Sequence, residues 1–377
     1  MDNRGQAASE YVAILLVVAA ALTGAATLAV AVPGVGERVV TTVRTGLCIV
    51  GGDVCRSSDA IAAGLKPCVT SQRSRRQETT VDIAVVRLGG HGEWQLALRS
   101  DGQAVVTRLE ENELGGTVGV GLTFSPAGVD AAASASLVAG YRGGRAWRFP
   151  DARSAGAFLA AATRDASARA ARAPNVRWHA INGQADGEAS VAIADLARAG
   201  ISTGASNAIG LRSEGARRTL TLDLRLDDPL LSGILHGLAP SAGTQRSWVA
   251  DVSWEGGQAR ELALRAATGR AGRQEEYSAR LDLRPAGNRA VAERLLQPSA
   301  STPSDLAALA ERMRTHGVIE QAAYSVSEER RGFTVAGKLG LALGLAHHRI
   351  TAERRLVDAI ASIRGGPLQR RFDCTGV

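Results

Sequence analysis

The chain has few aromatic residues, very little lysine and few cysteines. Phe, Trp and Tyr make up 4% of the 377 residues, so the core must be built mainly from Ala, Val and Leu. Lysine occurs only at Lys66 and Lys338, so nearly all of the positive charge is arginine. Four cysteines in a chain of this length exclude a small disulfide-rich protein, and 45% apolar residues exclude intrinsic disorder.

The charge balance is positive, but the arginines are spread along the chain. Lys and Arg number 44 against 37 Asp and Glu, which gives a formal net charge of +7. A nucleic-acid partner would need arginines gathered on one element. The sequence shows only the short run Arg73, Arg75 and Arg76. We therefore expect no nucleic-acid partner.

Patterns that would carry chemistry are weak. Residues 200–204 read Gly-Ile-Ser-Thr-Gly, which matches the G-x-S-x-G pattern of a nucleophile elbow, but the stretch that follows does not look like a helix. His347 and His348 are adjacent, so on a strand they face opposite ways and cannot bind one ion together. The acidic residues in 110–113 are interpreted as a solvated turn. We expect no enzyme activity, no cofactor and no metal site.

The N-terminus contains one long apolar run. Residues 12–32 carry no charge, and Pro33 follows them. A helix of that length spans about 31 Å, close to the hydrocarbon thickness of a bilayer. Residues 29–31 read Ala-Val-Ala, a formal signal-peptidase site, but the run exceeds the usual apolar core of a secretory signal and Glu10 precedes it. We predict a single membrane-spanning helix, with the C-terminal domain outside the cytoplasm.

An acidic residue directly before this run is unusual, because a carboxylate beside a membrane-spanning helix is costly unless it is paired. The chain has Gly5 and Gln6, then Glu10 and Tyr11, and then the apolar run. This arrangement resembles the leader of type IV prepilins of the Flp/Tad (tight adherence) class. The resemblance covers about the first 32 residues.

The resemblance implies cleavage by a prepilin peptidase between Gly5 and Gln6. Glu10 would then be the fifth residue of the mature chain, with Tyr11 behind it, and would pair with the Gln6 α-amine of a neighbouring subunit. It implies lateral association with copies of the same chain or with other pilins. The main pilins of this class are little more than the helix, whereas a long chain follows here, so the resemblance favours a minor pilin or a TadE-like pseudopilin.

The four cysteines are Cys48, Cys55, Cys68 and Cys374. They include no C-x-x-C pair, and no histidine lies at zinc-finger spacing from them. In an exported chain an even number of cysteines favours disulfides. Of the three possible pairings we favour Cys48 with Cys55 and Cys68 with Cys374, which would tie the end of the chain to the base of the exported domain.

Apolar and polar residues alternate along several later segments, as in half-buried antiparallel strands. Clear examples are residues 118–124, 220–226, 277–283 and 333–345. Helices are expected after Pro150-Asp151, from Asn288 to Leu296, and after Thr302-Pro303. A strand, a proline and a helix follow one another twice, but the side chains of the two occurrences do not agree, so we expect one large domain rather than a duplication. The N-terminal helix and the charged face of the 220–226 strand argue against a transmembrane barrel.

These observations predict an α+β fold, with one N-terminal transmembrane helix followed by a large antiparallel β-rich exported domain with a few short helices. The expected divisions are a leader (1–5), a pilin-like helix (6–33), a cysteine-containing linker (34–78) and the β-rich domain (79–377). The expected function is that of a membrane-anchored, pilin-like structural protein that assembles through its N-terminal helix. The alternative is a single-pass, membrane-tethered surface binding protein.

Overall fold

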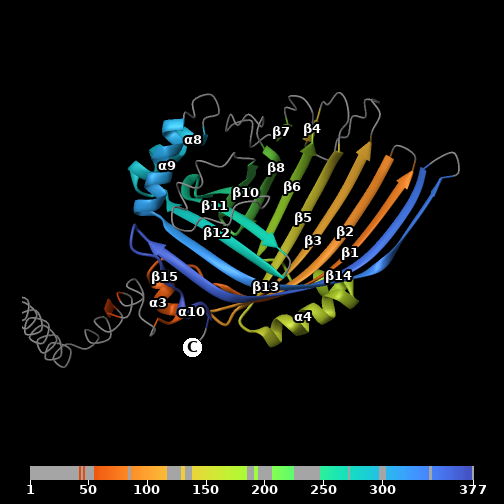
Figure 1. The fold of residues 1–377 in the computed structure, drawn as a ribbon, viewed down its shortest axis with the longest axis horizontal. Coiled ribbons are helices and arrows are strands. Elements are labelled where there is room, and N and C mark those ends of the chain that lie inside the picture. The colour runs from red at the N-terminus through yellow and green to blue at the C-terminus, as the bar shows by residue number, and fades with distance from the viewer. Residues whose placement is uncertain are drawn as a thin grey trace, which may run out of the picture. The chain divides into compact units, whose positions relative to one another are not determined.

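A computed structural model describes residues 42–43, 46, 55–83, 86–116, 129–131, 138–184, 191–193, 206–224, 247–270, 272–296, 303–338 and 342–375. The chain divides into two compact units, Met1–Lys66 and Pro67–Val377. In the first unit, α3 (Ser57–Ala62) is the helix with defined bounds. All the strands belong to the second unit (Figure 1).

The second unit is built mainly from long strands. Its strands are β1 (Val69–Ile83), β2 (Val86–Arg99), β3 (Ala104–Gly116), β4 (Val129–Ala131), β5 (Val138–Phe149), β6 (Val176–Gln184), β7 (Val191–Ile193), β8 (Ser206–Glu214), β9 (Arg217–Leu224), β10 (Ser247–Glu255), β11 (Gln258–Arg270), β12 (Arg273–Asp282), β13 (Val318–Lys338), β14 (Ala342–Ile363) and β15 (Gln369–Arg370). Its helices are α4 (Ala152–Arg164), α5 (Ala166–Ala170), α8 (Ala286–Leu296), α9 (Pro303–His316) and α10 (Phe372–Thr375).

The long strands close into a ring. Each pairs antiparallel with the next in the order β1-β2-β3-β5-β6-β8-β9-β10-β11-β12-β13-β14, and β14 returns to pair with β1. The closing ladder runs from Ser71 opposite Arg355 to Ile83 opposite Leu343. The unit is therefore a closed antiparallel barrel of 12 strands. Strand β15 adds to the end of β14, while β4 and β7 form a separate two-stranded sheet.

The ring divides into two halves with the same order of elements. In the first, α4 and α5 lie between the fourth strand, β5, and the fifth, β6. In the second half, β9 to β14, α8 and α9 again lie between the fourth strand, β12, and the fifth, β13. The helical connections, the start of β1 and the end of β14 lie at one end of the barrel, which we call the helix end. The opposite end, where β1 ends and β2 begins and where β13 ends and β14 begins, is the far end.

The two faces of the wall differ in polarity. The helices pack on the outer face, along the margin of the barrel in Figure 1. Apolar side chains of β9 to β13 form one outer cluster with α8 and α9, and those of β2, β3 and β5 form another with α4. The outer residues buried in these clusters include Trp94, Val106, Trp147, Leu220, Val252, Leu262 and Leu281. Because side chains alternate along a strand, their neighbours in sequence face inward.

Helix α4 illustrates how the sequence sets this packing. Asp151 is its N-cap, with a carboxylate oxygen that accepts the Ser154 backbone N–H at 2.7 Å. Hydrogen bonds to this N–H and to the Ser154 hydroxyl lower the pKa of Asp151. Phe158 then reaches the outer wall, with ring centroids 5.1 Å from Trp147 and 5.2 Å from Phe149. The helix expected after Pro150-Asp151 is confirmed.

The expected α+β fold class is wrong, because the strands form one closed barrel. The alternation within 220–226 and 277–283 correctly predicted strands β9 and β12, while 118–124 lies outside the described residues. Local periodicity does not reveal which distant strands pair. The charged face of the strand Arg217–Leu224, which argued against a barrel, is the inner face of the wall. The expected helix over residues 12–32 lies outside the described residues.

Among the described residues, no helix has both the length and the apolar character that crossing a membrane requires. The expected leader and pilin-like helix, 1–5 and 6–33, also lie outside the described part of the chain. Strand β1 begins at Val69, within the segment 34–78 that was expected to be a linker. The alternating run 333–345 was expected as one strand, but it spans the connection between β13 and β14.

Candidate functional site on the inner face

The inner face of the barrel carries charged and hydroxyl side chains. By register they share one side of the wall, opposite the side on which the helices pack. The inner residues with defined partners include Gln72, Glu111, Thr219, Asp251, Ser253, Glu276, Arg280, Glu320 and Arg354. Such a wall can hold polar or charged groups, whereas the outer wall beneath the helices cannot.

Arg354 of β14 spans the closure of the ring. Its Nη2 donates to Oε1 of Gln72 on β1 at 2.7 Å, and its Nη1 pairs with Glu276 on β12. Its guanidinium also lies 4.6 Å from the centre of the Tyr324 ring on β13. One side chain thus ties together four strands at the place where the first and last strands of the ring meet.

A second group of charges lies beside it, toward the helix end. Glu320 of β13 accepts from Arg280 of β12 at 2.8 Å and from Arg371 at 2.5 Å. Arg371 follows β15 and also pairs with Asp373 at 2.7 Å. The Arg371 and Asp373 side chains are only 5% and 1% exposed. Because each buried charge has an opposite partner, the cluster fixes the C-terminal segment against the inner wall without an unpaired charge.

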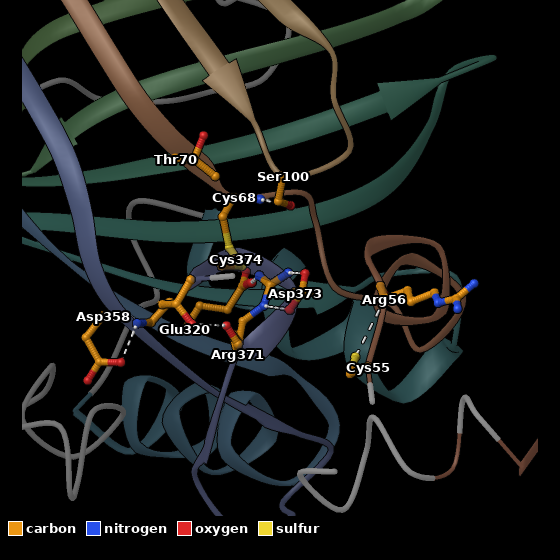
Figure 2. The surroundings of a disulfide bond; sticks show 12 residues. Cys55, Arg56, Cys68, Thr70, Ser100, Glu320, Asp358, Arg371, Asp373 and Cys374 are labelled. Carbon is orange, nitrogen blue, oxygen red and sulfur yellow. Dashed lines mark hydrogen bonds and ion pairs between the residues drawn. A yellow bond between two sulfur atoms is a disulfide. The ribbon is translucent and has the colours of Figure 1, made fainter. Parts of the chain in front are cut away.

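A disulfide joins this segment to the start of the barrel. Cys374 of α10 is bonded to Cys68, one residue before β1, with the two Cα atoms 5.6 Å apart (Figure 2). This is the pairing that the sequence analysis favoured. Figure 2 also shows that Arg371 reaches both Glu320 and Asp373 beside the bridge. The two cysteines and Asp373 lie close enough to suggest metal ligands, but sulfur atoms joined in a disulfide do not supply thiolates.

On the inner wall of β2 and β3 a histidine lies against a buried carboxylate. His91 Nε2 lies 2.8 Å from Glu111 Oε2, and the two side chains are 14% and 6% exposed. Glu111 therefore lies within a strand, and the interpretation of 110–113 as a solvated turn was wrong. The sequence signal was available, because a polar residue at every second position of a strand marks a polar face.

Across the barrel the wall is held by smaller contacts. Asp251 of β10 accepts from the Thr221 hydroxyl at 2.7 Å and pairs with Arg265 of β11 at 2.5 Å. Trp178 of β6 lies directly over Gly144 of β5, where a side chain would collide with the indole. Gly144 is thus required by a close approach on the inner face.

The remaining sequence-based expectations fall in different places. Gly5, Gln6, Glu10 and Tyr11 lie outside the described residues, and so do Cys48 and the G-x-S-x-G segment. Cys55 is disulfide-bonded, and its pairing with Cys48 stays a prediction. His347 and His348 face opposite ways as expected, because His347 contacts Thr79 on the outer face and His348 contacts Thr334 on the inner face.

No protein-family model matches the chain, and no curated protein matches it. Among solved structures, a mutant of the TodX monoaromatic hydrocarbon channel is 10% identical, over 81% of this chain and 93% of that one, with a TM-score of 0.18. A porin mutant of Rh. blastica is 7% identical over 74% and 99%, with a TM-score of 0.20. The translocator domain of the autotransporter NalP from Neisseria meningitidis is 9% identical over 78% and 92%, with a TM-score of 0.16. These TM-scores are too low to establish a fold, and the strand pairing alone establishes the barrel.

The barrel corrects the expected function. A pilin-like protein was expected to place an α+β head on an assembling helix, and the alternative was a tethered single-pass binding protein. Instead, the second unit closes through its own first and last strands, with paired charges on the inside. The pilin-like and single-pass interpretations are both withdrawn.

Proposed function

We propose that the barrel is a membrane-inserted β-barrel whose polar interior admits charged or polar solutes. The closed ring is the observation that carries this proposal. In hydrocarbon every backbone N–H and C=O must find a partner within the protein, and a closed antiparallel ring meets that condition without an open edge. A ring of 12 strands lies between barrels of about 8 strands, which side chains can fill, and water-filled barrels of about 16 strands.

The outer wall indicates which part would meet lipid. Near the helix end, Arg73 and Arg355 flank Glu353 on the outer face, and the two arginine side chains are 70% and 67% exposed. Nearer the far end, beyond the exposed outer pair Glu329 and Arg331, the exposed outer residues of β13 and β14 are apolar: Phe333 is 52% and Leu345 is 43% exposed. Charged side chains are costly in lipid, whereas these apolar ones are not. We assign the lipid-facing surface to the apolar ends of β13 and β14 beyond Arg331.

We propose a non-enzymatic role. The inner charges are engaged with one another: Glu320 is shared by two arginines, and Asp251 is shared by Arg265 and Thr221. This arrangement stabilises a polar wall rather than activating a nucleophile. Net selectivity would come from the charges that still meet water, such as Arg265, whose side chain is 52% exposed.

Single-channel recording tests the proposal. The full chain, purified in detergent and added to a planar bilayer, should give discrete conductance steps. Arg265→Glu should shift the reversal potential in a salt gradient toward cation selectivity, because it makes the lumen more negative. Arg153→Glu makes the same charge change on the exposed surface of α4 and should leave the reversal potential unchanged. Absence of conductance, or equal shifts in the two variants, would contradict a solute path through the barrel.

A further inference from the structure

One layer of the outer wall carries a row of arginines. Arg108 of β3 is directly opposite Arg145 of β5, which is directly opposite Arg177 of β6. In the same layer Arg108 is opposite Trp94 of β2, and the Arg108 guanidinium lies 5.1 Å from the centre of the Trp94 ring. Three consecutive strands thus place three cations side by side on one face.

This arrangement costs stability in the isolated sheet. Directly opposed residues have Cβ atoms about 5 Å apart, and like charges at that spacing repel. Glu110 lies 3.2 Å from Arg108 and offsets part of its charge. Arg145 and Arg177 are both exposed, and in the part of the chain that the structure describes neither forms an ion pair. The triplet therefore has a surplus of positive charge.

Two glycines lie in the next layer toward the far end. Gly143 lies between Glu110 and His179 and is itself buried, so its backbone is not open to a ligand. Gly92 of β2 lies against the Arg108 guanidinium, which a Cβ at Gly92 would approach to 3.0 Å. Arg108 is therefore half-buried over β2, whereas Arg145 and Arg177 are the exposed members of the row.

We infer that Arg108, Arg145 and Arg177 form a binding site for a phosphate group on the outer face of the barrel. Three guanidinium groups within about 10 Å offer several N–H donors to one phosphate, and arginine suits phosphate through paired hydrogen bonds. Bound phosphate would also relieve the repulsion between the opposed arginines. The inference does not depend on conduction by the barrel.

The site lies where a phospholipid headgroup could reach it. Arg75 of β1 lies in the same layer as the three arginines. Along β1, Arg73 lies on the helix-end side of this layer, and Thr79, which contacts His347, lies on its far-end side. It is therefore between the charged outer surface of the helix end and the exposed apolar residues of the far half. A soluble phosphate ester has the same chemistry, so the two sources need separate tests.

Thermal unfolding of the full chain in detergent tests the site. Sodium phosphate should raise the midpoint of the wild type above that in sodium chloride at matched ionic strength, because a ligand that binds only the folded state stabilises it. Arg145→Gln should weaken phosphate binding by about tenfold or more. In chloride alone, Arg145→Gln should unfold at a higher temperature than the wild type, because the central like charge is removed.

Arg153→Gln on α4 is the matched control, since it removes one exposed arginine that has no ion pair among the described residues. It should respond to phosphate as the wild type does. Equal phosphate stabilisation in all three proteins would overturn the inference, and so would a lower midpoint of Arg145→Gln in chloride. If the wild type binds duplex DNA more tightly than phosphate and Arg145→Gln weakens the binding of both, the assignment to a small phosphate ligand is wrong.

Vesicles separate the two sources of phosphate. Vesicles with phosphatidylglycerol in phosphatidylcholine should bind the wild type more tightly than phosphatidylcholine alone, and Arg145→Gln should lose that difference, if the ligand is a headgroup. If free phosphate stabilises the wild type but the vesicles show no such difference, the ligand is a soluble phosphate ester. Both results support the phosphate site, and neither depends on the conductance test.

Discussion

At the scale of single residues, the inner wall depends on charges that are shared. Glu320 accepts from both Arg280 and Arg371, whose side chains are 10% and 5% exposed. Removing one partner of a buried ion pair leaves an uncompensated charge, which costs far more than removing an exposed pair. Strand β13 carries one acidic residue in a buried ion pair and one in an exposed ion pair. Replacing each in turn compares the two costs in free energy of unfolding.

Glu320→Ala should lower the free energy of unfolding by about 3–5 kcal/mol, because it leaves two buried guanidinium groups without their shared acceptor. Glu329→Ala removes an acid of the same strand whose side chain is 61% exposed and pairs with Arg331. That change should cost about 1 kcal/mol or less. Urea unfolding of both variants checks the prediction, and similar losses would show that Glu320 does not hold the cluster.

The N-cap of α4 predicts a dependence on pH. Hydrogen bonds from Ser154 lower the pKa of Asp151 below its ordinary value of 3.8. An acid with a lowered folded pKa stabilises the folded state fully above its ordinary pKa and loses that effect as the pH falls through the folded value. Asp151→Ala should therefore destabilise the protein near neutral pH, with a difference from wild type that shrinks below pH 3.8.

Circular dichroism melts of wild type and Asp151→Ala across that range measure the effect. Asp151→Asn is the control, because asparagine also caps helices but does not titrate. A constant difference between wild type and Asp151→Ala at all pH values would show that the charge of the cap plays no part.

At the scale of elements, the helices on the wall were more predictable than their location. Asp151 before α4 and Pro303 at the start of α9 are local signals, and both helices occur where those signals place them. Local signals could not show that the strands themselves close into a ring, so the sequence predicted an α+β fold instead.

Phe158 provides a test of the α4 contact. Its ring lies between those of Trp147 and Phe149 on the outer wall. Phe158→Ala should lower the free energy of unfolding by about 3 kcal/mol, because it removes these contacts and leaves a cavity. Ala157→Ser is a control on the exposed side of the same helix and should change stability by less than about 1 kcal/mol. Equal effects would indicate that α4 does not pack on the wall.

At the scale of the whole molecule, the grouping of charged side chains on each face of the barrel could not be predicted from the sequence. Arg73, Arg75 and Arg76 formed a short run in the sequence, but the fold separates them: Arg73 and Arg75 are on the outer face and Arg76 is on the inner face. In contrast, Arg108, Arg145 and Arg177 are far apart in sequence and adjacent in the sheet. Cross-strand register decides which arginines are separated and which lie together, and spacing along the sequence does not give that register.

The disulfide acts on the molecule as a whole, because Cys68 and Cys374 are 306 residues apart in sequence. Closing so long a loop restricts the unfolded chain strongly, and such bridges contribute about 2–4 kcal/mol. The double variant Cys68→Ser/Cys374→Ser should lose that amount in urea unfolding. Under reducing conditions wild type and variant should unfold alike; a difference that persists there would mean that the serines, not the missing bridge, cause the loss.

The pairing of β1 with β14 also has a consequence for how the protein is made. A ribosome completes β1 long before it reaches Ala342, where β14 begins. Throughout that interval the nascent chain displays an unpaired strand edge, which is a template for aggregation. Until β14 is made, the free edge of β1 must therefore be kept from pairing with other chains. A chain that stalls before β14 leaves that edge exposed.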